Sequence, residues 1–214
     1  MREEITMDFY EAVNKRRTIR DFENYVIDDD TLERIISAGM RAPTNDHMRD
    51  WAFIVIEDQS VTTELLQLIP KEFSEEDMEN LIRDWNLSDK CQQNCYRDAV
   101  PKQNRMLADA SLVIIPLLKQ KTDILNPDSL SHLNGLASIW CCIENIFLAA
   151  TAEGLACNLR IPLGMEGEWA RKTLGFPKDY LMPCFIGIGK PAKDARIVEQ
   201  KEFDVKEVIH KNKW

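Results

Sequence analysis

The stretch LNGLASIWCCIENIFLAATAE, residues 133–153, decides the fold, because it predicts one long helix that is apolar almost all round. Along one face the apolar side chains recur at helical spacing, namely Leu136, Trp140, Ile143, Phe147 and Ala150. A helix with so little polar surface must be buried in a large core or against another subunit. A chain of 214 residues can just hide it, but a dimer hides it more easily, so we expect a dimer.

Around this helix the chain reads as alternating helices and short apolar strands. Apolar runs at 51–56, 111–118, 155–161 and 184–188 predict strands that helices cover on both faces. Acids at Asp28–Asp30 mark the start of a helix. We find no repeat or linker, so residues 1–214 are expected to form one domain. The polar segment at about 61–105 predicts a helical lid, and about 190–214 forms a C-terminal arm.

The charge pattern limits the partners. The net charge is −9, which disfavours nucleic acid and anionic membranes. Two basic islands, residues 15–20 and the lysine-rich tail from Lys190, indicate a small anionic ligand such as a phosphate. Charges interrupt the longest apolar stretches, so no segment is expected to span a membrane. The start, Met1–Glu4, lacks the apolar run of a signal peptide, and we expect a cytoplasmic protein.

Six cysteines are expected to be free thiols. Cys141 and Cys142 lie in the apolar helix, which favours a place in the core for both. Cys91 and Cys95 are one helical turn apart, a spacing that can bind metal. Because no second Cys or His pair lies near them in the sequence, we expect no zinc site.

The cluster Arg16-Arg17-Thr18-Ile19-Arg20 is the first candidate binding motif. Arginine forks match phosphate oxygens through paired, charge-assisted hydrogen bonds. The alternative is that the residues up to Arg17 offset the dipole at a helix C-terminus, which leaves Arg20 unexplained. From the residues alone, both interpretations stay open.

The second candidate is the loop of residues 42–51, APTNDHMRDW, between a helix and a strand. It offers many side-chain donors and acceptors, although Pro43 and Asn45 also suit a plain turn. His47 could donate a proton near neutral pH or simply form a hydrogen bond. The chain has no hydrolase, kinase or dinucleotide-binding signature.

Taken together, these motifs resemble the FMN-dependent nitroreductase family. The resemblance runs from about Phe9 to Trp214. Its elements are the arginine cluster followed by Phe22, the Ala42-Pro43-Thr44 loop entering a strand at Trp51, and a long helix ending AATAEGL. A Leu174–Pro177 turn then leads into Gly187–Pro191.

The resemblance implies an α+β fold, with a mixed, mostly antiparallel sheet flanked by helices, and an intertwined homodimer around the long central helix. FMN would sit at the dimer interface. The phosphate and ribityl chain would contact Arg16, Thr18 and Arg20, with Arg17 at the ring edge and Arg196 or Lys201 adding charge. The partner would supply Pro43, Thr44, Asn45 and His47. The strand end with Arg160, Ile161 and Pro162 would pass the reactive edge of the ring.

The chain departs from the family pattern at two places. His47 stands where the motif has asparagine, and Arg49-Asp50 replace Gln-Pro. Ile161-Pro162 stand where some relatives have an acidic residue and glycine. Because proline has no N–H, a backbone donor at that point would come from Ile161 or a neighbour.

The resemblance further implies an oxidoreductase that works by a ping-pong mechanism. NADH or NADPH would reduce the flavin, which then reduces a small-molecule acceptor of nitroaromatic or quinone type. No side chain is assigned as a catalytic acid. Three alternatives stay open: dehalogenase-like or flavin-consuming chemistry on the same fold, a flavin-binding module with little turnover, and a helical interaction protein without cofactor.

Overall fold

The computed structural model describes residues 7–214; the Met1–Glu4 stretch lies outside the described residues. A six-stranded sheet forms the centre, with the strand order β1-β6-β3-β2. β4 pairs with β6 and β5 with β3 off this path. The bounds are β1 Phe22–Glu23, β2 Trp51–Ile56, β3 Leu112–Lys119, β4 Ala156–Arg160, β5 Tyr180–Leu181 and β6 Phe185–Pro191.

All the ladders between these strands are antiparallel. Thr18 and Cys157 form an isolated bridge in which the two segments run parallel. The mixed, mostly antiparallel sheet expected from the sequence is therefore confirmed. The four predicted apolar runs correspond to β2, β3, β4 and β6.

Helices surround the sheet. Their bounds are α1 Phe9–Lys15, α2 Asp29–Met40, α3 Gln59–Leu65, α4 Glu75–Asp84, α5 Lys90–Ala99, α6 Arg105–Ala108, α7 Asn134–Ala152, α8 Glu166–Leu174 and α9 Val205–Val208. Two short 3-10 turns, η1 Val100–Lys102 and η2 Leu130–Leu133, join them. Asp28 caps α2 by accepting a hydrogen bond from the Thr31 amide at 2.9 Å.

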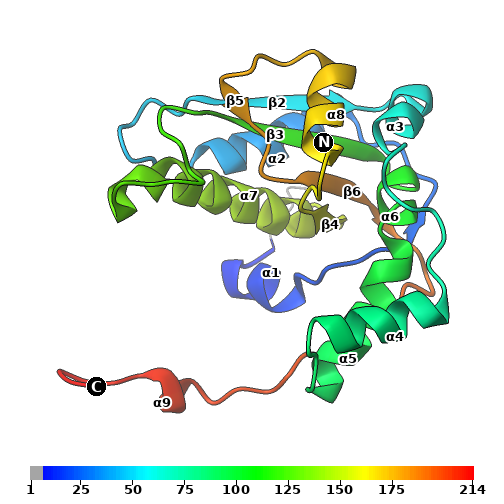
Figure 1. Cartoon of the computed structure of the whole chain (residues 1–214). Helices are drawn as coiled ribbons and strands as arrows, with labels where there is room; N and C mark the ends of the chain where they lie inside the picture. Colours follow the sequence, from blue (N-terminus) through cyan, green and yellow to red (C-terminus); the bar gives the residue numbers. More distant parts are fainter. Residues whose placement is uncertain (1–6) are drawn as a thin grey trace.

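The side chains of β3 point alternately to the two faces of the sheet, so this strand contributes to two hydrophobic cores. Leu112, Ile114 and Leu118 face the core formed with α2 and α7, while Val113, Ile115 and Leu117 face the core under α3, α6 and α8. Burial on both faces explains why this strand is apolar at almost every position. Figure 1 shows α7 running beneath the sheet beside α2.

Residues 130–152, which include the long helix, differ from one expectation of the sequence analysis, that charges interrupt every long apolar stretch. By length and composition, residues 130–152 are apolar enough to cross a membrane, with a mean hydropathy of 1.5. In the structure Ile139, Cys142 and Ile146 of this helix have no solvent exposure, because they pack in the α2–α7 core. Its apolar face is therefore a core face of this fold.

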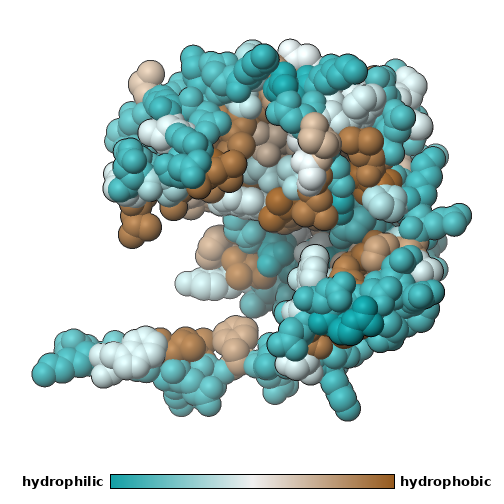
Figure 2. Space-filling model, viewed as in Figure 1, coloured by the Kyte–Doolittle hydropathy of each residue, from teal (hydrophilic) through white to brown (hydrophobic). Residues whose placement is uncertain are grey.

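Two parts extend from the body (Figure 1). The helices α4 and α5 project on one side and are held together by ion pairs from Arg97 to Glu75 and Glu79. The segment beyond β6 runs past α5, and its last residues, 200–214, are exposed throughout. Figure 2 shows that this arm stands off the body, with apolar side chains gathered on the surface that faces it.

Candidate functional site

The arginine segment lies along the edge of β4. Thr18 bridges Cys157, and the Ile19 amide donates to the Cys157 carbonyl at 3.1 Å. The buried Asn158 then donates from Nδ2 to the Ile19 carbonyl at 3.1 Å and to the Met106 carbonyl at 3.0 Å. These bonds fix the path of residues 18–20 beside β4, with the side chain of Ile19 buried.

Each arginine of the segment has its own protein partner. Arg16 Nε lies 3.2 Å from Glu144 of α7. Arg17 donates to the carbonyls of Asn14 and Arg16 at 2.8 and 2.7 Å, as expected of a cation at a helix C-terminus. Arg20 pairs with Asp98 of α5 at 3.2 Å. Each interpretation of the cluster therefore fits a different arginine. Arg17 stabilises the C-terminus of a helix, whereas Arg20 contacts α5 and is still a candidate for phosphate binding.

A pocket of about 720 Å³ opens between this segment, α5 and the start of the arm. Arg17, Thr18, Arg20 and Lys201 all line it, so the structure brings these four predicted residues together. We call it the anion pocket. Lys201 lies 3.0 Å from Asp89, and this hydrogen bond raises the pKa of Lys201.

The donors of the anion pocket fit an anionic oxygen group. Guanidinium, hydroxyl and ammonium donors line the same pocket, together with the carboxylate of Asp89, and this set of donors suits a phosphate. Arg20 also has a buried Nε without a hydrogen-bond partner among residues 7–214. Arg16 and Arg196 lie outside the lining; Arg196 instead approaches Asp98, with 3.9 Å between Nε and Oδ1.

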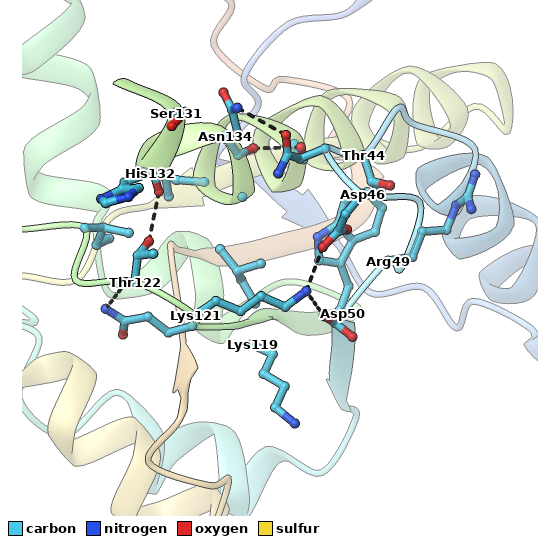
Figure 3. A pocket seen from close by; sticks show the side chains of 18 residues that line it. Thr44, Asp46, Arg49, Asp50, Lys119, Lys121, Thr122, Ser131, His132 and Asn134 are labelled. Carbon is cyan, nitrogen blue, oxygen red and sulfur yellow. Dashed lines mark hydrogen bonds and ion pairs between the residues drawn. The ribbon is translucent and has the colours of Figure 1, made fainter. Parts of the chain in front are cut away.

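The loop after α2 lines a second pocket of about 340 Å³, drawn in Figure 3. Thr44 and Asn45 belong to its lining, whereas Pro43 and His47 do not. Asn134 donates to Asn45 at 3.1 Å. The side chain of His47 is exposed, and its φ of 60° places it in the left-handed region.

Three charged residues in the lining of the second pocket pair with one another. Lys121 Nζ lies 2.7 Å from both Asp46 and Asp50, as Figure 3 shows. These two carboxylates raise the pKa of Lys121 to about 12, and the hydrogen bond from Lys121 lowers the pKa of Asp46. Within one chain no lining residue is shared with the anion pocket.

The strand end at residues 160–162 lies outside both pockets. The Arg160 side chain is buried and engaged by Glu166 and Gln103, so its donors are committed to the protein. Ile161 is 57% exposed and Pro162 is half-buried. A ligand approaching this turn would therefore meet Ile161 before Arg160.

The cysteines are free, but one expectation was wrong. Cys142 is buried as predicted, whereas Cys141 is exposed because it faces away from the core on α7. Cys91 and Cys95 line the anion pocket. Burial and the neighbouring Cys91 raise the pKa of Cys95. Among residues 7–214 no cluster of three or more His, Cys, Asp or Glu is placed to hold a metal ion.

Sequence reasoning missed two residues that shape the anion pocket. Asp98 is one of several acids in a polar helix, and Asn158 is one polar residue in an apolar strand. A polar residue inside an otherwise apolar strand is a usable signal, because burial requires it to find partners. Nothing in the sequence separates Asp98 from its acidic neighbours.

Comparison with known proteins shows the family of the chain. The sequence model of the nitroreductase family matches residues 13–190, which include the arginine segment, the loop of residues 42–51 and the long helix, whereas Lys201 lies beyond the match. The chain belongs to the nitroreductase family. The α+β fold expected from the sequence is thus confirmed as the nitroreductase fold.

Relatives of this nitroreductase-family chain differ in what their names describe. Iodotyrosine deiodinase 1 of Mus musculus is 23% identical over 207 residues, covering 95% of this chain and 69% of the relative. A BluB-like flavoprotein from Clostridium difficile 630 has a TM-score of 0.70 at 18% identity, covering 96% and 99% of the two chains. The NADPH:FMN oxidoreductase from Vibrio harveyi, in complex with NAD+, has a TM-score of 0.68 at 18% identity, covering 96% of this chain and 77% of that one.

Proposed function

We propose that this protein is an FMN-dependent oxidoreductase that uses NADH or NADPH to reduce a small, electron-poor acceptor of nitroaromatic or quinone type. The observation that carries the proposal is the anion pocket, in which Arg17, Thr18, Arg20 and Lys201 converge. Family membership and the flavin chemistry named for structural neighbours support it.

The residues of the chain have defined tasks in this proposal. Arg20 and Lys201 bind the phosphate, since both present charged donors to the pocket. Thr18 adds a hydroxyl donor next to them. When bound, FMN would supply two-electron redox chemistry, and the protein supplies orientation and electrostatics.

We also propose a homodimer. The exposed face of α7 includes Ala137 and Cys141, and the arm carries exposed apolar side chains, among them Phe203 at 83% and Trp214 at 101%. Large apolar side chains at full exposure are typical of surfaces that a partner covers. In a dimer the second pocket and the turn at Ile161 of one chain would complete the site at the anion pocket of the other.

A dehalogenase-like reaction is the second candidate, because iodotyrosine deiodinases are among the curated relatives that match. One assay separates the two. The FMN-loaded protein is supplied with NADH or NADPH and, in parallel, with a nitroaromatic, a quinone or iodotyrosine. Rapid oxidation of the nicotinamide with the first two supports the oxidoreductase. Iodide release under reducing conditions, without turnover of the others, would favour the dehalogenase.

A further inference from the structure

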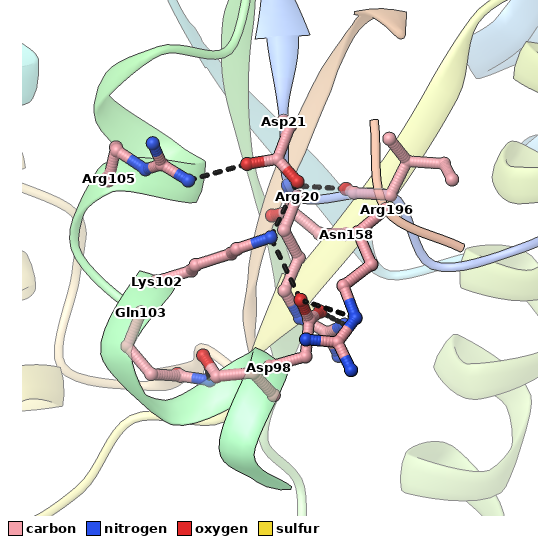
Figure 4. A network of polar contacts seen from close by, with 10 residues as sticks. Arg20, Asp21, Asp98, Lys102, Gln103, Arg105, Asn158 and Arg196 are labelled. Atoms are coloured by element: carbon pink, nitrogen blue, oxygen red, sulfur yellow. Dashed lines mark hydrogen bonds and ion pairs between the residues drawn. The ribbon is translucent and has the colours of Figure 1, made fainter. Parts of the chain in front are cut away.

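Asp98 of α5 lies where the segments that build the anion pocket meet. Its side chain is buried, with a residue exposure of 3%. Three cations from different segments approach it, as Figure 4 shows: Arg20 at 3.2 Å, Lys102 at 2.9 Å and Arg196 at 3.9 Å. Lys102 continues to Asp21 at 2.6 Å.

Asp98 does not line the anion pocket, whereas Arg20 does. Asp98 can therefore act on a ligand only through its neighbours. A guanidinium has five N–H donors, and the bond to Asp98 uses Nη1. That bond fixes the direction of a long side chain and leaves its other donors for a ligand.

We propose that Asp98 is a positioning residue, which holds the Arg20 guanidinium in place for the phosphate of a bound phosphate monoester. This role rests on the proposed function, in which the pocket holds the FMN phosphate. Fixing Arg20 in advance removes a rotamer-entropy cost from binding.

The charge of Asp98 has the opposite effect, since a carboxylate near a phosphate weakens its binding. Lys102 and Arg196 lie on the same carboxylate and offset this charge. The cluster stays net positive with Asp98 present, so we expect positioning to dominate.

FMN and riboflavin differ only in the phosphate, and their dissociation constants therefore isolate its contribution. We expect Asp98→Ala to weaken FMN binding by roughly tenfold to a hundredfold, the range for one charge-assisted hydrogen bond. Riboflavin binding should stay within about twofold of the wild type. Asp98→Asn keeps an oxygen that accepts from Arg20 and should retain most of the FMN affinity.

The Arg20→Ala background tests whether the effect passes through Arg20. There, Asp98→Ala should cause no further loss of FMN affinity. Glu153→Ala is the matched control, because Glu153 pairs with Arg34 at 2.7 Å outside the pocket lining. It should leave the ratio of FMN to riboflavin affinity unchanged.

Three results would overturn the role of Asp98: equal losses of FMN and riboflavin affinity, an additive loss in the Arg20→Ala background, or tighter FMN binding by Asp98→Ala. Asp98→Ser, too short to reach Arg20, replaces the alanine variant where that one does not fold. Wild-type protein that binds neither flavin would contradict the proposed function and this role together. Wild-type protein that binds both flavins equally would contradict only the phosphate assignment and the role built on it.

Discussion

The side chain of Asn158 donates from Nδ2 to the carbonyl oxygen of Ile19 at 3.1 Å, and this bond ties the arginine segment to the sheet. Asn158 is 1% exposed and also donates to Met106 of α6. One buried amide thus sets the position of Thr18 and Arg20 relative to β4 and α6.

Replacing Asn158 tests this arrangement. Asn158→Ala leaves two carbonyls without their donor and should lower the free energy of unfolding by about 1–3 kcal/mol, measured in urea. FMN binding should also weaken, because residues 18–20 lose their support. Asn145→Ala is the matched control: it removes one bond to the Ala38 carbonyl at 3.2 Å on α2, and should reduce stability without affecting FMN affinity. If Asn158→Ala and Asn145→Ala weakened FMN binding equally, this account would be contradicted.

Loss of the cations that line the anion pocket should release the cofactor. The double variant Arg20→Ala/Lys201→Ala should retain much less FMN than the wild type after gel filtration, since both charged donors assigned to the phosphate are lost. Arg34→Ala, which removes an arginine paired with Glu153 outside the anion pocket lining, should retain FMN normally. Unchanged FMN affinity of the double variant would exclude the phosphate assignment.

The proposed dimer is tested by a charge on the exposed face of α7. Cys141→Glu should shift the protein toward monomer in sedimentation velocity, because a buried unpaired carboxylate is costly. Val26→Glu, at a side chain that is 84% exposed in the loop before α2, provides the control. A wild-type protein that sediments as a monomer at every concentration would contradict the proposal.

Acid stability should depend on Asp21. Burial alone would raise the pKa of Asp21, but the hydrogen bond from Lys102 and the charges of Lys102 and Arg105 lower it below 3.8. A carboxyl with a lowered pKa in the folded state stabilises the protein above its unfolded pKa, and this contribution disappears as the pH falls through the folded value. Asp21→Asn should therefore flatten the loss of stability below about pH 4.

Urea denaturation between pH 3 and pH 7 measures this slope. Asp179→Asn serves as the comparison, since Asp179 is exposed and 3.9 Å from Lys119. An Asp21→Asn curve parallel to that of the wild type would exclude the stabilising role of Asp21.

The strands were predictable because their signal is local. β2 has the same bounds as the apolar run 51–56 that predicts it. Asp28 caps the N-terminus of α2, where the acidic residues predict that a helix begins. Residues 130–152 show the limit of such local patterns. Their length and composition would suit a membrane-spanning helix as well as a core helix, and composition does not distinguish the two. Cys141 shows the same limit, because a helix that is apolar all round does not reveal which face is covered.

Only part of the candidate site could be predicted from the sequence. The arginine cluster and Lys201 carry charge patterns that point to an anion, and the structure brings Arg17, Thr18, Arg20 and Lys201 to one pocket. The partners that orient them could not be predicted, because Asp98 lies 78 positions from Arg20 in the chain. Contacts at that separation follow from the fold and leave no spacing pattern in the sequence.

The most direct test of the central claim is the visible absorption spectrum of the purified protein, with the released chromophore identified after denaturation. We predict the bands of oxidised flavin, bleaching on addition of NADH or NADPH, and FMN as the released compound. A colourless protein that does not take up added FMN would contradict the account.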